Sequence, residues 1–111
     1  MPDALLVLST CASAEEGARI ARSLVESRLA ACVNIVPSIR SVYRWRDMIE
    51  DAAECLLIVK TNQTRLPALQ AELARLHSYE VPEILAVPVA AGAESYLAWL
   101  ASALDFPEDD G

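Results

Sequence analysis

The pattern of hydrophobic and polar positions predicts seven elements of secondary structure along the chain. Three short apolar runs are typical of buried strands and lie at residues 4–8, 55–60 and 84–89. A fourth strand is predicted where apolar and polar residues alternate, between residues 33 and 45. Apolar residues at helical spacing predict three helices, over residues 13–29, 64–76 and 93–104. This order predicts the α+β plan called ferredoxin-like, an antiparallel sheet with two helices on one face, here with an additional C-terminal helix.

The predicted helices carry start signals and apolar stripes. Ser13 is a typical N-cap residue and Glu16 follows three positions later, which together predict a capping box. On the first helix, the apolar side predicts burial of Ala21, Leu24 and Val25. The second helix has a leucine stripe at spacings of three, four and three, formed by Leu66, Leu69, Leu73 and Leu76. The third helix is expected to bury Leu97, Leu100 and Leu104.

The alternating strand leads into a predicted β-hairpin. Its apolar positions share one parity and predict a single common face for Val33, Ile35, Ile39, Tyr43 and Trp45. Pro37 cannot donate a hydrogen bond to a neighbouring strand, so we expect a bulge or bend there. Arg46 and Asp47 follow as a tight turn, because Asp tolerates positive φ better than most residues. The next strand, residues 55–60, is apolar on both faces, which favours a central position in the sheet.

The predicted hairpin is too long for a compact domain of this size. From Val33 to Trp45 a strand spans about 43 Å at about 3.3 Å per residue. A compact chain of 111 residues has a radius of gyration of about 13 Å and a diameter of about 34 Å. The tip therefore reaches beyond the globule, carrying Val42, Tyr43, Trp45, Met48 and Ile49. A protruding apolar arm needs a partner surface, so we expect a homo-oligomer.

Composition and charge narrow the range of partners. Hydrophobic residues make up 54% of the sequence, above the usual value of about 45–50%, which also indicates apolar surface covered by another chain. The formal net charge of −7 argues against binding to nucleic acid or to an anionic membrane, because both are bound through clustered Lys and Arg. The first ten residues lack a basic segment before their apolar run, so no secretory signal is expected.

The cysteines and the histidine are the first candidates for metal chemistry. Three cysteines with no C-x-x-C pair indicate neither a disulfide framework nor a zinc knuckle, so we expect one cytoplasmic domain (1–105) with reduced thiols and an acidic solvated tail (106–111). Cys32 and Cys55 are interpreted as core residues. Cys11 precedes a helix N-terminus, which would lower its pKa and favour metal binding. His77 either complements the dipole at the end of the second helix or binds a metal.

The loop before the last strand contains paired carboxylates. Glu80 and Glu83 could bind a cation, serve in acid–base chemistry or simply lie in a solvated loop. Lys60 ends an apolar strand, and a carboxylate of this loop is its expected partner. Three scattered glycines make no phosphate loop, and no nucleophile, base and oxyanion site come together, so we expect no enzyme. RNA-recognition domains share the plan but need basic surroundings, which this acidic chain lacks.

Three blocks of sequence then carry a family resemblance, namely "RLAACVNIVPSIRSVYRW", "IE…ECLLIVKT" and "YEVPEILAVPV…YLAWL". Together they resemble the CutA divalent-cation-tolerance family over nearly the whole chain. The resemblance implies a cytoplasmic homotrimer of ferredoxin-like subunits, similar in architecture to the PII signalling proteins, in which the long hairpin pairs across subunits. It also implies a role in tolerance of heavy metals, with copper the metal usually named.

The resemblance also points to ligand positions. Family members with a copper site use a Cys just before the Thr that ends the first strand and a His-His pair, and these positions here hold Ser9, Leu76 and His77. Cys11 lies two residues beyond Ser9. We expect weak binding of copper or another divalent cation, with His77 and Cys11 as the metal ligands and with Glu80 or Glu83 as further candidates. The alternative is a PII-like signalling or scaffold trimer. It would bind a small molecule or a protein partner in a cleft between subunits, near Trp45, Lys60, Tyr79, Glu80 and Glu83.

Overall fold

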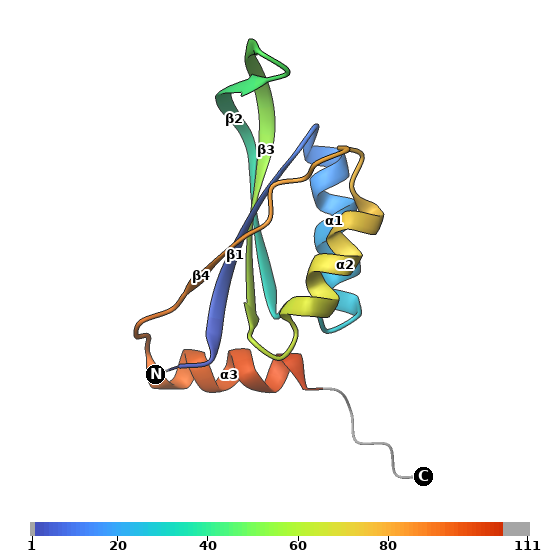
Figure 1. Cartoon of the computed structure of the whole chain (residues 1–111). Helices are drawn as coiled ribbons and strands as arrows, with labels where there is room; N and C mark the ends of the chain where they lie inside the picture. The colour runs from blue at the N-terminus through green and yellow to red at the C-terminus, as the bar shows by residue number, and fades with distance from the viewer. Residues whose placement is uncertain (1, 106–111) are drawn as a thin grey trace.

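A computed structural model describes residues 2–105 and contains the seven elements in the predicted order (Figure 1). They are β1 (Ala4–Cys11), α1 (Ala14–Glu26), β2 (Cys32–Trp45), β3 (Met48–Asn62), α2 (Leu66–Leu76), β4 (Leu85–Pro88) and α3 (Glu94–Leu104). The predicted tail, residues 106–111, lies outside the described residues. None of the helices within residues 2–105 is long and apolar enough to cross a membrane.

The four strands form one antiparallel sheet in the order β2-β3-β1-β4. The ferredoxin-like plan is confirmed, with α1 and α2 side by side on one face and α3 across the end of the sheet that is far from the hairpin (Figure 1). β3 is central as predicted, but it begins at Met48 rather than near residue 55. Residues 50–54, three acidic residues and two alanines, give no strand signal in the sequence. They nevertheless pair with β2 along the whole hairpin, because this pairing satisfies their backbone groups.

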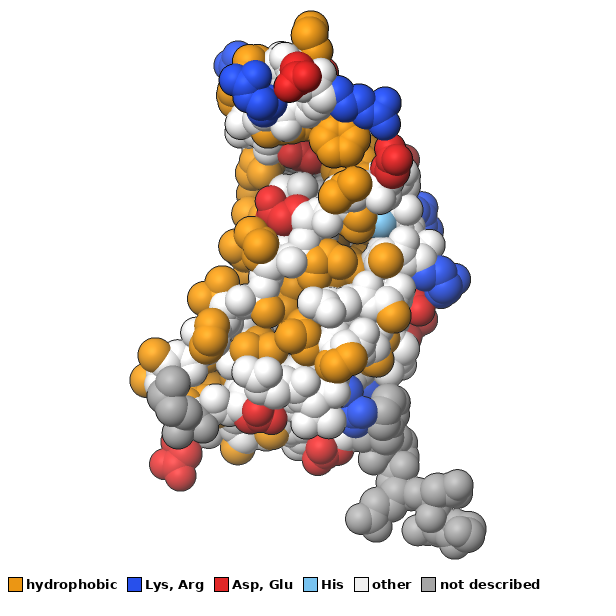
Figure 2. All heavy atoms as spheres, in the orientation of Figure 1, with side chains coloured by type: hydrophobic (Ala, Val, Ile, Leu, Met, Phe, Trp, Pro, Cys, Tyr) orange, Lys and Arg blue, Asp and Glu red, His pale blue; other side chains and the backbone are white. Residues whose placement is uncertain are grey.

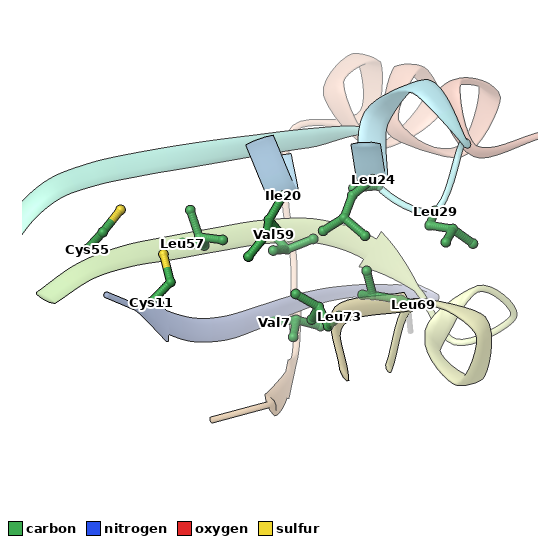
Figure 3. Close-up of a cluster of buried hydrophobic side chains, with 11 residues drawn as sticks. Val7, Cys11, Ile20, Leu24, Leu29, Cys55, Leu57, Val59, Leu69 and Leu73 are labelled. Carbon is green, nitrogen blue, oxygen red and sulfur yellow. The ribbon is translucent and has the colours of Figure 1, made fainter. Parts of the chain in front are cut away.

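The main core lies between the sheet and the helices α1 and α2. Alternate residues of β1 and β3 meet the apolar stripes of the two helices (Figure 3), and the fully buried side chains include Val7, Leu57, Val59, Ile20, Leu24, Leu69 and Leu73. Val25 was predicted to be buried and is instead 42% exposed. The stripe of α1 that faces the sheet runs through Gly17, Ile20, Ala21 and Leu24, and Val25 lies about 100° around the helix from Leu24.

The opposite face of the sheet is also apolar but has little cover within residues 2–105. Strand register places Leu6 and Leu8 of β1 on this face, next to Ile58 of β3 and to the exposed Leu85 and Val87 of β4. The end near the start of β1 is covered by α3, which packs through Leu100 and Leu104 as predicted. In Figure 2, hydrophobic side chains cover much of the surface between the charged hairpin tip and α3. The sheet therefore has one covered and one largely open apolar face.

A β-bulge in β2 decides which way the hairpin side chains point. Between Val36 and Ile39 the register with β3 shifts by one residue, which confirms the predicted bulge at Pro37. Because side chains alternate between faces, one extra residue reverses the face of everything beyond it. The predicted common face is therefore wrong. Val33 and Ile35, before the bulge, lie on the helix side. Ile39, Tyr43 and Trp45, after it, lie on the other side.

Beyond the bulge, β2 and β3 continue as a two-stranded arm, residues 39–54, that rises past the helices (Figure 1). The molecule measures 52 × 33 × 22 Å with a radius of gyration of 15.0 Å, larger than a compact chain of this length, so the predicted overshoot is confirmed. Arg46 and Asp47 form the turn with φ values of 50° and 65°, the two positive values of a type I′ turn. Met48 and Ile49 beside the turn are 64% and 62% exposed.

Candidate functional site

An open cleft lies where the arm meets the loop between α2 and β4, residues 77–84. It has a volume of about 750 Å³. Three aromatic rings and three carboxylates contribute to its lining, namely Tyr43, Trp45, Tyr79, Glu54, Glu80 and Glu83. The bulge is what turns the rings of the arm toward this cleft instead of toward α1. The structure therefore brings together four of the five residues predicted to bind a small molecule, which are Trp45, Tyr79, Glu80 and Glu83.

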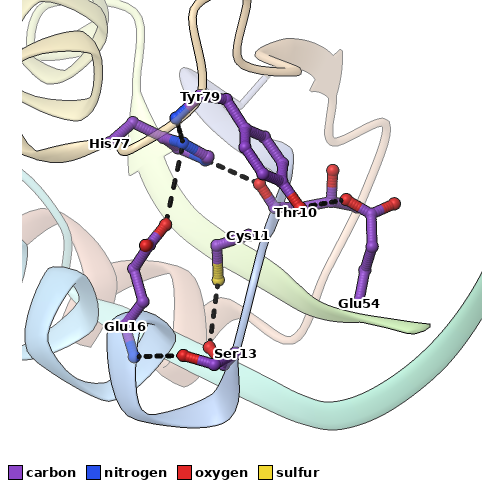
Figure 4. A network of polar contacts seen from close by, with 7 residues as sticks. All are labelled: Thr10, Cys11, Ser13, Glu16, Glu54, His77 and Tyr79. Atoms are coloured by element: carbon purple, nitrogen blue, oxygen red, sulfur yellow. Dashed lines mark hydrogen bonds and ion pairs between the residues drawn. The ribbon is translucent and has the colours of Figure 1, made fainter. Parts of the chain in front are cut away.

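Glu54 and Tyr79 join the arm to the loop at the cleft wall. Glu54 is only 8% exposed, and the Tyr79 hydroxyl donates a hydrogen bond of 2.7 Å to its Oε2 atom (Figure 4). Burial, followed by this hydrogen bond and by the Glu54 charge, raises the pKa of Tyr79 above its ordinary value of 10.0. Tyr79 therefore keeps its proton near neutral pH and remains a donor to the carboxylate.

His77 fixes the start of the loop through both of its ring nitrogens (Figure 4). Its Nε2 atom lies 2.6 Å from the carbonyl oxygen of Thr10, and the backbone N–H of Tyr79 donates to its Nδ1 atom at 3.1 Å. A carbonyl only accepts and a backbone N–H only donates, so these contacts fit the neutral tautomer with its proton on Nε2. His77 is also the C-cap residue of α2. It ends the helix as predicted, but by bonding to backbone rather than as a cation.

The helix start beside His77 is only partly the predicted capping box. The Ser13 hydroxyl accepts a hydrogen bond of 3.1 Å from the N–H of Glu16, which confirms the N-cap. The Glu16 carboxylate turns toward His77 instead of completing the box, and its Oε1 atom lies 3.8 Å from Nδ1. Within the described chain this oxygen is buried and has no hydrogen-bond partner.

Cys11 lies under α1, opposite Cys55 in the β1–β3 ladder. Its thiol donates to the carbonyl oxygen of Ser13 across 3.6 Å. Burial, followed by the hydrogen bond and charge of Cys55, raises the pKa of Cys11 from 9.0 to about 12. The prediction that the helix N-terminus lowers this pKa is wrong, because the cost of desolvating a thiolate here is larger than the stabilisation by the helix.

As they are arranged, His77 and Cys11 do not fit a resident copper ion. Soft cations are bound by thiolates and by imidazole nitrogens with a free lone pair. The Nδ1 lone pair of His77 is taken by an amide, and Cys11 keeps its proton. Across residues 2–105, no three or more His, Cys, Asp or Glu side chains are grouped so that they could hold a metal ion.

Lys60, the fifth residue predicted at the cleft, lies elsewhere. Its ammonium group donates to the side-chain oxygen of Asn34 and lies 3.8 Å from the sulfur of Cys32. The predicted partner, a carboxylate of the 77–84 loop, is therefore wrong, because β3 runs from the arm toward α3 and carries Lys60 away from that loop. Glu80 pairs instead with Arg46, through a contact of 3.0 Å between Nη2 and Oε2.

Three features of the cleft were missed at the level of sequence. Arg46 is one, and its guanidinium lies 5.3 Å from the centroid of the Trp45 ring. Tyr43 was predicted only as part of an exposed tip, and Glu54 was not predicted at all. A signal for Glu54 existed, since it directly precedes the apolar run at residues 55–60. Its burial depends on a loop that folds over the end of β1, and sequence spacing does not show this.

Comparison with known proteins covers almost the whole chain. The family described as CutA1 divalent ion tolerance protein matches residues 5–103. The divalent-cation tolerance protein CutA of Thermus thermophilus is 50% identical over 95 residues, covering 86% of this chain and 92% of that protein. The chloroplastic protein CutA of Arabidopsis thaliana is 44% identical over 96 residues, covering 86% of this chain. The chain spans about half the length of this plant relative, 53% of it.

A solved structure supports the same relationship. The crystal structure of CutA from Xylella fastidiosa has a TM-score of 0.90 at 41% sequence identity. The match covers 93% of this chain and 99% of the Xylella chain. The family match over residues 5–103 includes the arm, the 77–84 loop and most of α3.

Proposed function

Because this chain belongs to the CutA1 divalent ion tolerance family, we propose that it acts in divalent-cation tolerance as a homotrimer whose arm docks on neighbouring subunits. The arm is the observation that carries this assembly, since it extends past the helices and presents Met48 and Ile49 to solvent. Three is the number of subunits that the family resemblance implies.

The open face of the sheet supports the same assembly. Leu85 and Val87 are exposed on the edge strand β4, next to the half-buried Leu6 and Leu8 of β1. Contiguous apolar surface of this kind marks an interface in most proteins. Both edge strands, β2 and β4, also present unpaired backbone groups that a neighbouring chain can complete. A second and a third copy of the chain would therefore cover what one copy leaves open.

Native mass spectrometry and light scattering after size exclusion test the assembly. The double variant Met48→Glu/Ile49→Glu places two charges on an exposed part of the arm, so each subunit should still fold while the trimer dissociates. Val25→Glu is the matched control, since Val25 is an exposed apolar residue on α1 away from the arm, and it should remain a trimer. A monomeric wild type, or an arm variant that stays trimeric, would show that the arm does not hold the assembly.

Metal binding by His77 and Cys11 is proposed to be weak and to require rearrangement. To bind a cation, Nδ1 of His77 must release the Tyr79 amide and the buried Cys11 thiol must lose its proton. Calorimetric titration of the protein with copper or another divalent cation measures this directly. We expect weak binding that His77→Ala and Cys11→Ser reduce further. Stoichiometric binding that survives both substitutions removes these two residues from the proposal.

We also propose a binding role without catalysis, and a cytoplasmic location. The buried, protonated Cys11 is a poor nucleophile. Three cysteines with no C-x-x-C pair support a reducing compartment. Compartments differ among relatives, since one is described as chloroplastic and a solved structure from Archaeoglobus fulgidus as periplasmic. Cell fractionation with a compartment-specific marker tests the location.

A further inference from the structure

Among the described residues, the cleft contains a buried carboxylate that has no cationic partner. Glu54 is more than nine-tenths buried, and the neutral hydroxyl of Tyr79 donates its hydrogen bond. Within residues 2–105, no Lys, Arg or His nitrogen lies within 4.0 Å of this carboxylate. Buried carboxylates in proteins are usually compensated by a cation or by several donors. The wall of the cleft therefore offers a carboxylate with which a positively charged group can pair.

The rim of the same cleft shows which kind of cation it accepts. The guanidinium of Arg46 lies 5.3 Å from the centroid of the Trp45 ring and 3.0 Å from the Glu80 carboxylate. Aromatic faces attract cations, and a carboxylate beside the ring adds a charged hydrogen bond. The Arg46 side chain is 70% exposed, so this contact is weak and easily displaced. The chain itself thus places an organic cation between a ring and a carboxylate at the mouth of the cleft.

We propose that the cleft is a binding site for a small organic cation, an amine or a guanidine with an apolar stem. One charged group pairs with Glu54, and the stem lies along the rings of Tyr43 and Trp45. A second charged group, where the ligand has one, takes the place of Arg46 beside Glu80. This site goes beyond cation tolerance and is formed within a single chain.

The size and lining of the cleft favour an organic cation over a metal ion. A volume of about 750 Å³ lies in the range of small-molecule sites, and three aromatic rings supply apolar and cation–π contacts but no metal ligands. Hard divalent cations need several oxygen ligands at short range. Within the described residues, the carboxylates of the cleft are not grouped in that way.

The test uses agmatine, which carries a guanidinium and a primary ammonium on a four-carbon stem. Trp45 and Trp99 are the two tryptophans of the chain, so Trp99→Phe leaves the emission of Trp45 as a reporter in the cleft. We expect a saturable change in Trp45 fluorescence on titrating the assembled protein with agmatine. The matched probe 4-guanidinobutyrate, which has a carboxylate in place of the terminal aminomethyl group, should bind at least about tenfold more weakly because of the acidic lining.

Three substitutions locate the charge that the ligand pairs with. Glu54→Gln keeps an acceptor for Tyr79 and should weaken agmatine binding about tenfold or more, since it removes the buried charge. Glu50→Gln removes an exposed charge from the same strand outside the cleft lining, and binding should stay within about twofold of the parent. Arg46→Gln removes the internal competitor and should strengthen binding, by up to about fivefold.

Each remaining outcome overturns the proposal. A cleft filled by a neighbouring subunit gives no saturable response, and equal binding by the Glu54 and Glu50 variants places the ligand elsewhere. If MgCl₂ displaces agmatine at an equimolar level, the site belongs to a metal ion.

Urea denaturation of Glu54→Gln checks that this variant folds. Glu83→Gln, at an exposed position on the cleft, should also weaken binding without that risk, and unchanged binding in both variants rejects the site.

Discussion

Gly17 on α1 faces two thiols, and its replacement by alanine should destabilise the protein although alanine is the better helix former. A Cβ atom at this position would lie 2.7 Å from the sulfur of Cys55 and 3.2 Å from that of Cys11. Both sulfurs belong to the buried layer between α1 and the sheet (Figure 3). Helix propensity gains about 1 kcal/mol, whereas overpacking a core costs about 1–3 kcal/mol. We therefore expect a net loss of about 1 kcal/mol in the free energy of unfolding.

A double-mutant cycle with Cys55→Ala separates the effect of the close contact with the Cys55 sulfur from the effect of helix propensity. Without the Cys55 sulfur the nearest clash is gone, so Gly17→Ala should become neutral or stabilising, and the coupling energy should be about 1–2 kcal/mol. Ala18→Gly is the matched control, because Ala18 is an exposed neighbour on the same helix. It measures the propensity alone and should cost about 0.5–1 kcal/mol.

Urea denaturation followed by far-UV circular dichroism measures all of these variants. The protein concentration must be the same throughout, because the stability of an oligomer depends on it. The reasoning is refuted if Gly17→Ala stabilises the wild type as much as it stabilises the Cys55→Ala variant. In that case the two thiols do not limit how closely α1 packs on β3.

Three further predictions concern the loop, a thiol and the turn. Tyr79→Phe removes the donor to the buried Glu54 and should cost about 1–3 kcal/mol in urea denaturation, and less in a Glu54→Gln background. The pKa of Cys11 is raised from 9.0 to about 12, so its contribution to stability is complete below pH 9 and is lost as the pH rises toward 12. Urea midpoints across that range should therefore fall less in Cys11→Ser than in the wild type. Asp47→Gly relieves a φ of 65°. It should raise the free energy of unfolding by less than about 1 kcal/mol, seen as a higher thermal midpoint.

The fold was predictable where one physical rule acts alone. Helical spacing predicted α2 through its leucine stripe, and the buried Leu69 and Leu73 confirm it. The arm was predicted because the expected strand is longer than the expected diameter of the domain. The strand length follows from the rise per residue, and the diameter follows from the number of residues in the chain. The start of β3 was not predictable in this way. Its residues 50–54 are held by pairing with β2, and a pairing partner is not a property of the segment itself.

The site was less predictable because its residues depend on contacts that are distant in sequence. The sequence predicted that aromatic and acidic residues would line a binding site. It did not predict the burial of Glu54, which depends on Tyr79 reaching it from the loop. Cys11 shows the opposite error. The local rule, a thiol before a helix N-terminus, was applied correctly. It was then outweighed by burial beneath α1, which the local sequence does not reveal.

The bulge at Pro37 connects the fold of the arm to the residues of the cleft. In a regular strand, the alternation would place the rings of Tyr43 and Trp45 on the side of α1. The extra residue reverses this and brings the rings to face the 77–84 loop. It leaves Met48 and Ile49 at the tip, outside the cleft lining. The proposed assembly through the tip and the proposed cation binding in the cleft therefore depend on different residues of one arm, so substitutions can separate the two roles.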